Sequence, residues 1–311
     1  MDLQKTNYER VKKRALECER LQYDSLWFND HFFPPSAVNR QGRKKPQLEC
    51  WTTLTALASV TQKVRLGPLV LCNSFRHPAL LAKMAATLDV ISKGRLELGL
   101  GAGWYEPEYN AYGISYAPLK LRVAQLKESV QVIRKMWTED ETNFRGRFYL
   151  LKKAYCYPKP VQKPHPRIWI GGYGEEFLLR VVAEVADVYN NPLYFRRHWI
   201  EGFDYVKRKI DVLKRHCLSV DRNPDEIVDS LAESVLIANS EHEAQQKIKR
   251  YVEASNRRPS IAGTPEECIN AIRKYLNIGV SYFILVFEER SWLDEAKIFA
   301  EEVMYTLKNS D

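Results

Sequence analysis

The sequence predicts an α/β protein built on a parallel β-sheet, and three observations lead to this fold class. Short apolar runs and helical patterns alternate along most of the 311 residues. The runs are continuously apolar, as in strands that are buried on both faces. Several of them end in glycine or in polar residues, and α/β proteins place their functional sites at such strand ends. About seven strands are expected, each followed by a helix, with one extra helix in front, and a sheet of this kind is either open or closed.

The composition is that of a globular protein. Hydrophobic residues make up 45% and charged residues 28% of the chain, and no apolar run approaches the ~20 residues of a membrane span. The six cysteines are far apart without a Cys-x-x-Cys spacing, which indicates reduced thiols in the cytoplasm and no metal site. The net charge of +8 comes from dispersed basic residues without a nucleic-acid motif. We therefore expect a cytoplasmic protein with no nucleic-acid and no membrane partner.

The first half of the chain is expected to contribute three strands. They are the apolar runs at residues 25–28, 64–71 and 96–100. Apolar residues at helical spacing predict the helices of this half, which cover residues 8–18, 51–58, 77–91 and 119–137. Residues 138–167 break this rhythm with spaced prolines and aromatic residues, which indicates an insertion that contains a small β-ribbon.

The second half continues the alternation. Strands are expected at residues 167–170, 186–189, 231–238 and 282–287. Helices are expected to begin near Glu175, after Ser240 and after Thr264, where Thr264-Pro-Glu-Glu267 has the residues of a capping box, and to cover residues 293–307. Because no repeat or linker interrupts the chain, the sequence predicts one domain over residues 1–311.

The stretch Gly94-Arg-Leu-Glu-Leu-Gly-Leu-Gly-Ala-Gly-Trp104 is the most informative segment. A buried strand runs directly into a loop at Gly101 and Gly103 that has almost no side chains. Glycine there lets the backbone approach a flat or phosphorylated ligand, or it serves only the dihedral angles of a tight turn. The Gly-x-Gly pattern alone does not separate these two interpretations.

Polar residues follow the first two strands. Asp30 and His31 come directly after the strand at 25–28, where a neutral imidazole could move a proton or could hold the loop by hydrogen bonds. Cys72 and Asn73 end the next strand and either face a ligand or form a small buried turn. No base marks Cys72 as a nucleophile.

A second glycine-rich turn joins the strand at 167–170 to a helix. Its residues are Gly171, Gly172 and Gly174, followed by Glu175. Free N–H groups at a helix N-terminus bind phosphate, and glycine keeps the approach open. The turn matches neither a Walker loop nor a clean dinucleotide fingerprint.

Together these segments resemble the bacterial luciferase-like monooxygenase superfamily, and within it the coenzyme F-420 (deazaflavin) oxidoreductases. The resemblance rests on Tyr23-Asp-Ser-Leu-Trp-Phe-Asn-Asp-His-Phe-Phe33, on the stretch ending at Trp104 and on further segments that together span nearly the whole chain, at residues 64–78, 81–104, 157–172 and 263–266. It implies a TIM (β/α)8-type barrel, usually a homodimer, with the cofactor at the carboxyl ends of the strands.

The resemblance also implies roles for the residues at those ends. Asp30 and His31 would lie beside the cofactor ring, with His31 as proton donor or stabiliser. Leu69 and Val70 match a bulge, often with a non-proline cis peptide, that supports the ring from behind. The remaining residues would bind the ring, the ribityl chain or the phosphate: Cys72, Asn73, Gly101, Gly103, Gly171, Gly172 and Gly174.

Two departures from the family pattern stand out. The family's first strand, ahead of the helix near Asn7, is apparently missing from this chain. Some sugar-phosphate dehydrogenases of the family carry Glu directly after the Gly-x-Gly, where this chain has Trp104. Glu106 and Glu108 are then the next candidates for an acid.

The functional prediction is an oxidoreductase that transfers a hydride between F-420 and a small organic substrate. The alternatives are an FMN-dependent luciferase-like monooxygenase that uses oxygen, and a barrel that binds flavin, or serves a structural role, without catalysis.

Overall fold

The structure is a computed structural model that describes residues 7–35, 44–193 and 202–309. The chain divides into two compact units. Unit 1 contains Met1–Arg20 and Asp24–Asp187, and unit 2 contains Leu21–Tyr23 and Val188–Asp311. That residues 1–311 form one domain stays a prediction.

The strands of unit 1 are parallel. β1 (Ser25–Phe28) pairs with β2 (Arg65–Pro68), and a bridge between Leu66 and Leu96 connects β2 to the segment that enters β4 (Leu98–Gly101). β4 pairs with β3 (Leu71–Cys72) and with β7 (Ile168–Gly171). The single strand expected over residues 64–71 is therefore two short strands, separated at Leu69 and Val70.

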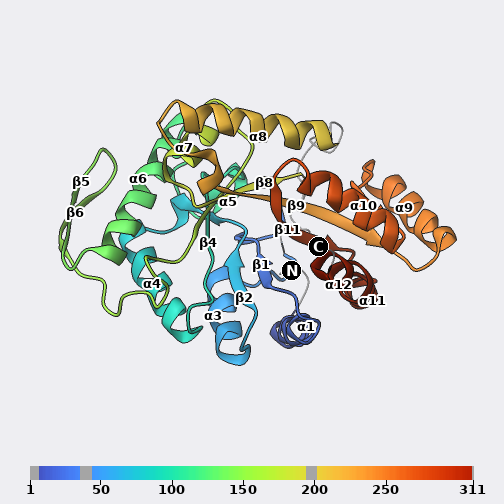
Figure 1. The fold of residues 1–311 in the computed structure, drawn as a ribbon. Helices are drawn as coiled ribbons and strands as arrows, with labels where there is room; N and C mark the ends of the chain where they lie inside the picture. The colour runs from blue at the N-terminus through green and yellow to red at the C-terminus, as the bar shows by residue number, and fades with distance from the viewer. Residues whose placement is uncertain (1–6, 36–43, 194–201, 310–311) are drawn as a thin grey trace. The chain divides into compact units, whose positions relative to one another are not determined.

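Helices α3 to α7 connect these strands, in the order that the apolar spacing predicts. Figure 1 shows α4 beside α6, and their apolar faces are buried. Two boundaries differ from the sequence prediction: the segment expected as a loop at 104–118 contains the short helix α5, and α7 begins three residues after Glu175. The helices of unit 1 are α1 (Tyr8–Arg20), α3 (Cys50–Val60), α4 (Pro78–Ile91), α5 (Glu106–Ala111), α6 (Leu119–Thr138) and α7 (Leu178–Val185).

The segment at 138–167 contains an antiparallel ribbon of β5 (Thr142–Arg145) and β6 (Leu150–Ala154). Figure 1 shows this ribbon beyond α6, away from the parallel strands. The buried carboxylate of Glu128 on α6 accepts hydrogen bonds from the backbone N–H groups of residues 147, 148 and 149, which fixes the turn of the ribbon to the helix.

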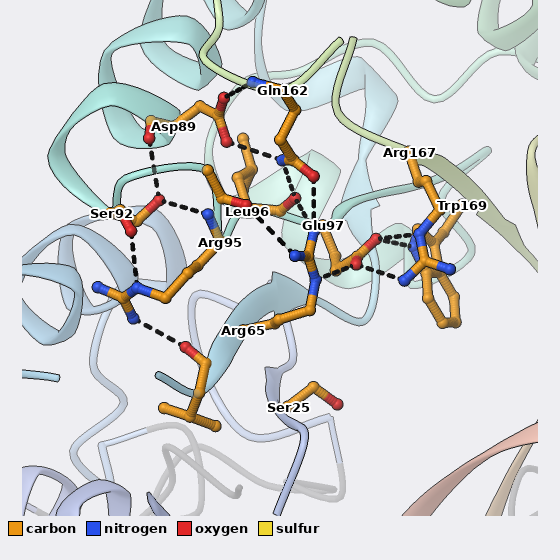
Figure 2. A network of polar contacts seen from close by, with 12 residues as sticks. Ser25, Arg65, Asp89, Ser92, Arg95, Leu96, Glu97, Gln162, Arg167 and Trp169 are labelled. Carbon is orange, nitrogen blue, oxygen red and sulfur yellow. Dashed lines mark hydrogen bonds and ion pairs between the residues drawn. The ribbon is translucent and has the colours of Figure 1, made fainter. Parts of the chain in front are cut away.

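The amino ends of the unit 1 strands are joined by an ionic network, which Figure 2 shows. Its centre is Glu97, which is fully buried directly before β4. Arg65, the first residue of β2, and Arg167, directly before β7, both donate to this carboxylate, and the indole of Trp169 donates to it at 2.6 Å. A buried carboxylate is tolerated only with such partners. The network therefore fixes the register of β2, β4 and β7 at one end.

Unit 2 is also built on parallel strands. The long strand β9 (Val228–Ile237) pairs with β8 (Val188–Pro192), β10 (Ile261–Gly263) and β11 (Val280–Phe287). The sequence did not predict β10 or the helix α8. The helices of unit 2 are α8 (Gly202–Leu218), α9 (Glu241–Ser255), α10 (Pro265–Leu276), α11 (Trp292–Ile298) and α12 (Tyr305–Asn309), with a π-helical segment (Phe299–Met304) before α12.

The cap signals of unit 2 are confirmed. The Thr264 hydroxyl accepts from the Glu267 N–H, and the Glu267 carboxylate accepts from the Thr264 N–H, so α10 has the complete capping box. Ser240 caps α9 with one bond, which its hydroxyl accepts from the Glu243 N–H. Among the described residues, no helix is long and apolar enough to cross a membrane.

Candidate active site at the carboxyl ends of the unit 1 strands

His31 lies in the loop after β1 and is paired with an acidic residue that is distant in sequence. Its Nδ1 atom is 2.9 Å from Oε2 of Glu108 on α5. The other carboxylate oxygen, Oε1, accepts from the backbone N–H of Phe32 at 2.7 Å and of Phe33 at 3.4 Å. The Glu108 side chain is 2% exposed and the His31 side chain 15% exposed. The loop and the imidazole are thus held by one buried carboxylate.

Asp30 has different partners from its neighbour His31. Its carboxylate accepts from both terminal nitrogens of Arg76, at 2.8 and 3.0 Å, and from the Cys72 N–H at 3.0 Å. Arg76 also donates to Glu49 at 2.6 Å, which caps α3. A bidentate pair of this kind is rigid. Asp30 therefore ties the end of β1 to the end of β3, and a direct catalytic role for it stays a prediction.

The bulge that the resemblance implied is present. The peptide between Leu69 and Val70 is cis, and both side chains are partly exposed, although the strands on either side are buried. Gly99 of β4 packs directly against this bulge, because a Cβ there would overlap the Pro68 carbonyl oxygen. The result is a partly exposed apolar surface at the carboxyl end of the strands.

Gly103 brings the glycine loop against Cys72. A Cβ at Gly103, which also has φ of +76°, would overlap the Tyr109 hydroxyl and the Cys72 thiol. That thiol lies 3.0 Å from the Tyr109 hydroxyl, and burial raises the pKa of Cys72 to about 11. The thiol is therefore protonated at neutral pH and is not a nucleophile.

Asn73 follows Cys72 and is 4% exposed. Its Nδ2 atom is buried and has no hydrogen-bond partner within the part of the chain that the structure describes. Buried polar groups are normally paired, so an orphaned donor at a strand end fits a site where a ligand supplies an acceptor.

The glycine turn after β7 adjoins the same end of the sheet. A Cβ on Gly101 would lie 3.5 Å from the Gly171 carbonyl oxygen, so the two glycine segments are in contact. Gly172 has φ of +146°, a conformation that side chains rarely adopt, and Gly174 has room for a Cβ at ordinary contact distance from Leu178. The turn leads into α7, as a phosphate-binding turn requires.

Aromatic side chains surround His31. Trp104 and Tyr105 meet the imidazole edge to face, with ring centroids 5.8 and 6.1 Å away. Phe32 stacks on Phe75 at 4.4 Å, next to the strand end. Trp104, the residue directly after the Gly-x-Gly, therefore presents an indole to the histidine.

Two residues of this site were not singled out by their sequence pattern. Arg76 is described above, and Arg122 on α6 donates to the carbonyl oxygens of Ala102, Gly103 and Ala117 while stacking on Tyr116. Arg122 thus holds the glycine loop from behind. Their signal in the sequence is weak, because a single arginine in a helical pattern or after a strand is ordinarily a surface residue.

The structure brings the predicted residues of β1, β3, β4 and β7 to one end of unit 1. The arrangement defines a class of protein: an α/β fold of parallel strands with an apolar bulge, glycine turns and a histidine at the carboxyl ends, suited to a flat cofactor with a phosphate.

Residues 1–282 match the family model described as luciferase-like monooxygenase. The chain belongs to this family. It is 28% identical over 293 residues to the F420-dependent glucose-6-phosphate dehydrogenase of Amycolatopsis mediterranei, covering 87% of this chain and 86% of that protein.

Solved structures show the same fold. The F420-dependent secondary alcohol dehydrogenase in complex with an F420–acetone adduct matches with a TM-score of 0.76 and 19% identity, over 97% of this chain and 96% of that one. Riboflavin lyase with modified FMN and riboflavin matches with a TM-score of 0.80 and 16% identity, over 97% and 84%. The predicted fold class is confirmed as the α/β type of luciferase-like TIM-barrel proteins, and the family includes both F420- and FMN-dependent oxidoreductases.

Proposed function

We propose that this protein is an F-420-dependent oxidoreductase that transfers a hydride between the deazaflavin and a small organic substrate. The observation that carries the proposal is His31, which is held by a buried carboxylate in the loop after β1 and contacts Trp104, the residue directly after the glycine loop. Three relatives that are 27–28% identical to this chain and are named F420-dependent glucose-6-phosphate dehydrogenases support F-420 rather than FMN.

The residues at this end have chemistry that fits the cofactor. Leu69 and Val70 offer an apolar surface to one face of a ring, and the orphaned Nδ2 of Asn73 offers a donor to a ring or ribityl oxygen. In the glycine turn after β7, Gly172 has a φ that side chains rarely adopt and Gly174 has room for a Cβ, so its backbone N–H groups would be the ones to hold a phosphate. Bound F-420 would supply the hydride chemistry, while the protein supplies position and electrostatics.

His31 is the group that would exchange a proton with the substrate. Asp30 and Glu108 are both occupied by hydrogen bonds to the protein, whereas part of the His31 ring is exposed. An imidazole can accept or donate a proton near neutral pH, so it suits both directions of a hydride transfer that is coupled to a proton.

FMN is the second candidate cofactor. The likeness to the FMN-containing riboflavin lyase favours it at the level of the fold. The apolar bulge does not distinguish the two rings, so the cofactor must be tested directly.

The test is a titration of the purified protein, freed of small molecules, with F-420 and with FMN in parallel, followed by absorbance and fluorescence. We expect saturable binding of F-420 and weaker binding of FMN. Tighter binding of FMN, with oxygen-dependent turnover of its reduced form, would establish the monooxygenase alternative. Binding of neither cofactor would remove the proposal.

The sugar phosphate of the named relatives is a separate question. An indole cannot deliver a proton as a carboxyl group does, and Trp104 follows the Gly-x-Gly where some sugar-phosphate dehydrogenases of the family are expected to carry Glu. We therefore expect glucose-6-phosphate to reduce the F-420-loaded protein slowly or not at all. Rapid reduction, followed at the deazaflavin absorbance band, would show that another group supplies that role.

A further inference from the structure

We infer that Glu108 is a positioning residue that fixes the tautomer and the orientation of the His31 imidazole. The kinetic consequence of this inference rests on the proposed function. The tautomer and the orientation of the His31 ring can be tested on the protein without a cofactor. It assigns Glu108 the role of orienting His31, in place of the role of a general acid.

The protonation state of Glu108 follows from its partners. Oε1 accepts from two backbone N–H groups, of Phe32 and Phe33, and a backbone N–H can only donate. An ionised carboxylate has acceptors on both oxygens and no donor. Oε2 is therefore an acceptor toward His31.

The tautomer of His31 follows in turn. Two acceptors do not form a hydrogen bond, so the 2.9 Å contact requires that Nδ1 of His31 carries a hydrogen. In the neutral imidazole only one nitrogen is protonated, and Nε2 is then left as the acceptor. A ring in this state can take up a proton at Nε2 and return it without disturbing the bond to Glu108.

Glu108 also sets the direction of the ring. The same carboxylate holds the backbone of the two residues after His31, so the loop and the imidazole are fixed to α5 together. Trp104 and Tyr105 then limit rotation by their edge-to-face contacts. Glu108 is 2% exposed, so it cannot reach a substrate itself and acts through His31.

Glu106 supplies a matched comparison. It lies in the first turn of the same helix α5, carries the same carboxyl group and is exposed. A change of charge there alters α5 and its surroundings without touching the His31 ring.

The experiment is ¹⁵N NMR of the protein labelled at histidine, with no cofactor added, at a pH where imidazole is neutral. The chain has six histidines, and the His31 signals are assigned by their loss in His31→Asn. We expect the wild-type His31 to carry its proton on Nδ1. In Glu108→Gln the amide oxygen can still accept from the Phe32 N–H, but its NH2 group faces Nδ1, so the proton should move to Nε2.

The control variant Glu106→Gln should leave the His31 signals unchanged. A wild-type His31 that is protonated on Nε2 would overturn the inference, whether or not Glu108→Gln folds. It would also be overturned if folded Glu108→Gln kept the wild-type tautomer.

The kinetic consequence is measured after loading with the cofactor that binds. Orienting partners of this kind commonly contribute roughly 10–100-fold, so we expect Glu108→Gln to lower kcat by about that factor while KM and cofactor affinity stay within a few-fold. Glu108→Asp, which keeps the charge, should recover part of the loss. If neither cofactor binds, the proposed function is removed. The tautomer of His31 would still decide the role of Glu108.

Discussion

The two ends of the unit 1 strands use buried carboxylates in opposite ways. At the amino end, Glu97 is enclosed by Arg65, Arg167 and the Trp169 indole, and every partner is a protein group (Figure 2). At the carboxyl end, the Glu108 carboxylate forms hydrogen bonds with the backbone of a loop and with a histidine whose ring is partly exposed. The buried carboxylate at the amino end is thus occupied by protein partners alone, while the histidine that the carboxyl-end carboxylate holds is partly exposed.

The difference extends beyond the carboxylates. Trp27 and Trp169 fill the space near the amino end, with ring centroids 4.4 Å apart, and Gly67 is required because a Cβ would overlap Trp27. Near the carboxyl end, Leu69 and Val70 are partly exposed, and the Asn73 amide nitrogen has no hydrogen-bond partner among the described residues. In this fold class the first end serves stability and the second serves function.

The largest effect is expected from His31→Ala at the carboxyl end. Removing a positioned acid or base typically costs about 10²–10⁴-fold in rate, so hydride transfer should fall by that range while cofactor affinity stays within a few-fold. Stopped-flow absorbance of the bound deazaflavin measures it, with a substrate that turns over.

His77→Ala is the control, because His77 is an exposed cap of α4 and should leave the rate unchanged. A near wild-type rate in His31→Ala would reduce His31 to a loop residue. The functional assignment of this end would then lose its main support.

At the amino end, Glu97→Gln should lower stability rather than activity. Breaking a buried ionic network leaves the two arginines without their partner, and since both reach solvent in part, we expect a loss of about 2–3 kcal/mol in the free energy of unfolding. Urea denaturation measures it, and cofactor affinity measured below the transition should not change. The surface variant Glu139→Gln should cost under about 0.5 kcal/mol.

The phosphate turn gives a smaller effect. Gly174 has room for a Cβ at 3.5 Å from Leu178, so Gly174→Val should fold normally. Its side chain would obstruct a phosphate, and we expect cofactor affinity to fall roughly 10-fold. Equal cofactor affinity in the variant and the wild type, with equal melting temperatures, would show that the phosphate binds at another site.

Asp229, near the amino end of β9 in unit 2, contrasts with Glu97 because its Oδ1 atom is buried and has no partner among the described residues. Burial raises the pKa of Asp229 from 3.8 to about 7, against the opposing charge of Lys214. The folded protein therefore holds this proton more tightly than the unfolded chain, and stability falls as the pH rises from about 4 to about 7.

Asp229→Asn should remove that part of the pH dependence. Above pH 7 the variant should be more stable than the wild type by up to about 4 kcal/mol, and near pH 4 the two should agree. Urea denaturation across this pH range measures the difference. Identical curves for the two proteins would show that Asp229 is ionised without penalty.

The sequence predicted most of the strands of unit 1 because buried parallel strands are continuous apolar runs. The glycine turns were predicted as local patterns, whereas the bulge at Leu69 and Val70 was expected only from the resemblance to the luciferase-like family. It did not predict α8, whose apolar residues are spaced among many charges, or β10, which is only three residues long.

The pairings of the site were not visible in the sequence. Glu108 and His31 are 77 positions apart, and Asp30 and Arg76 are 46 apart. Only the parallel register brings these loops together. The sequence therefore indicated Asp30, His31 and Glu108 as separate candidates, but it did not show that His31 pairs with Glu108 or that Asp30 pairs with Arg76.

Hydrogen–deuterium exchange of the backbone, with and without F-420, tests the contrast between the two ends most directly, because it needs no substrate. We predict slower exchange on binding in peptides that cover residues 69–75, 101–105 and 171–175, and no change in those that cover residues 61–66 and 92–97. Protection confined to the amino end, or equal protection at both ends, would contradict the assignment of the carboxyl end as the active site.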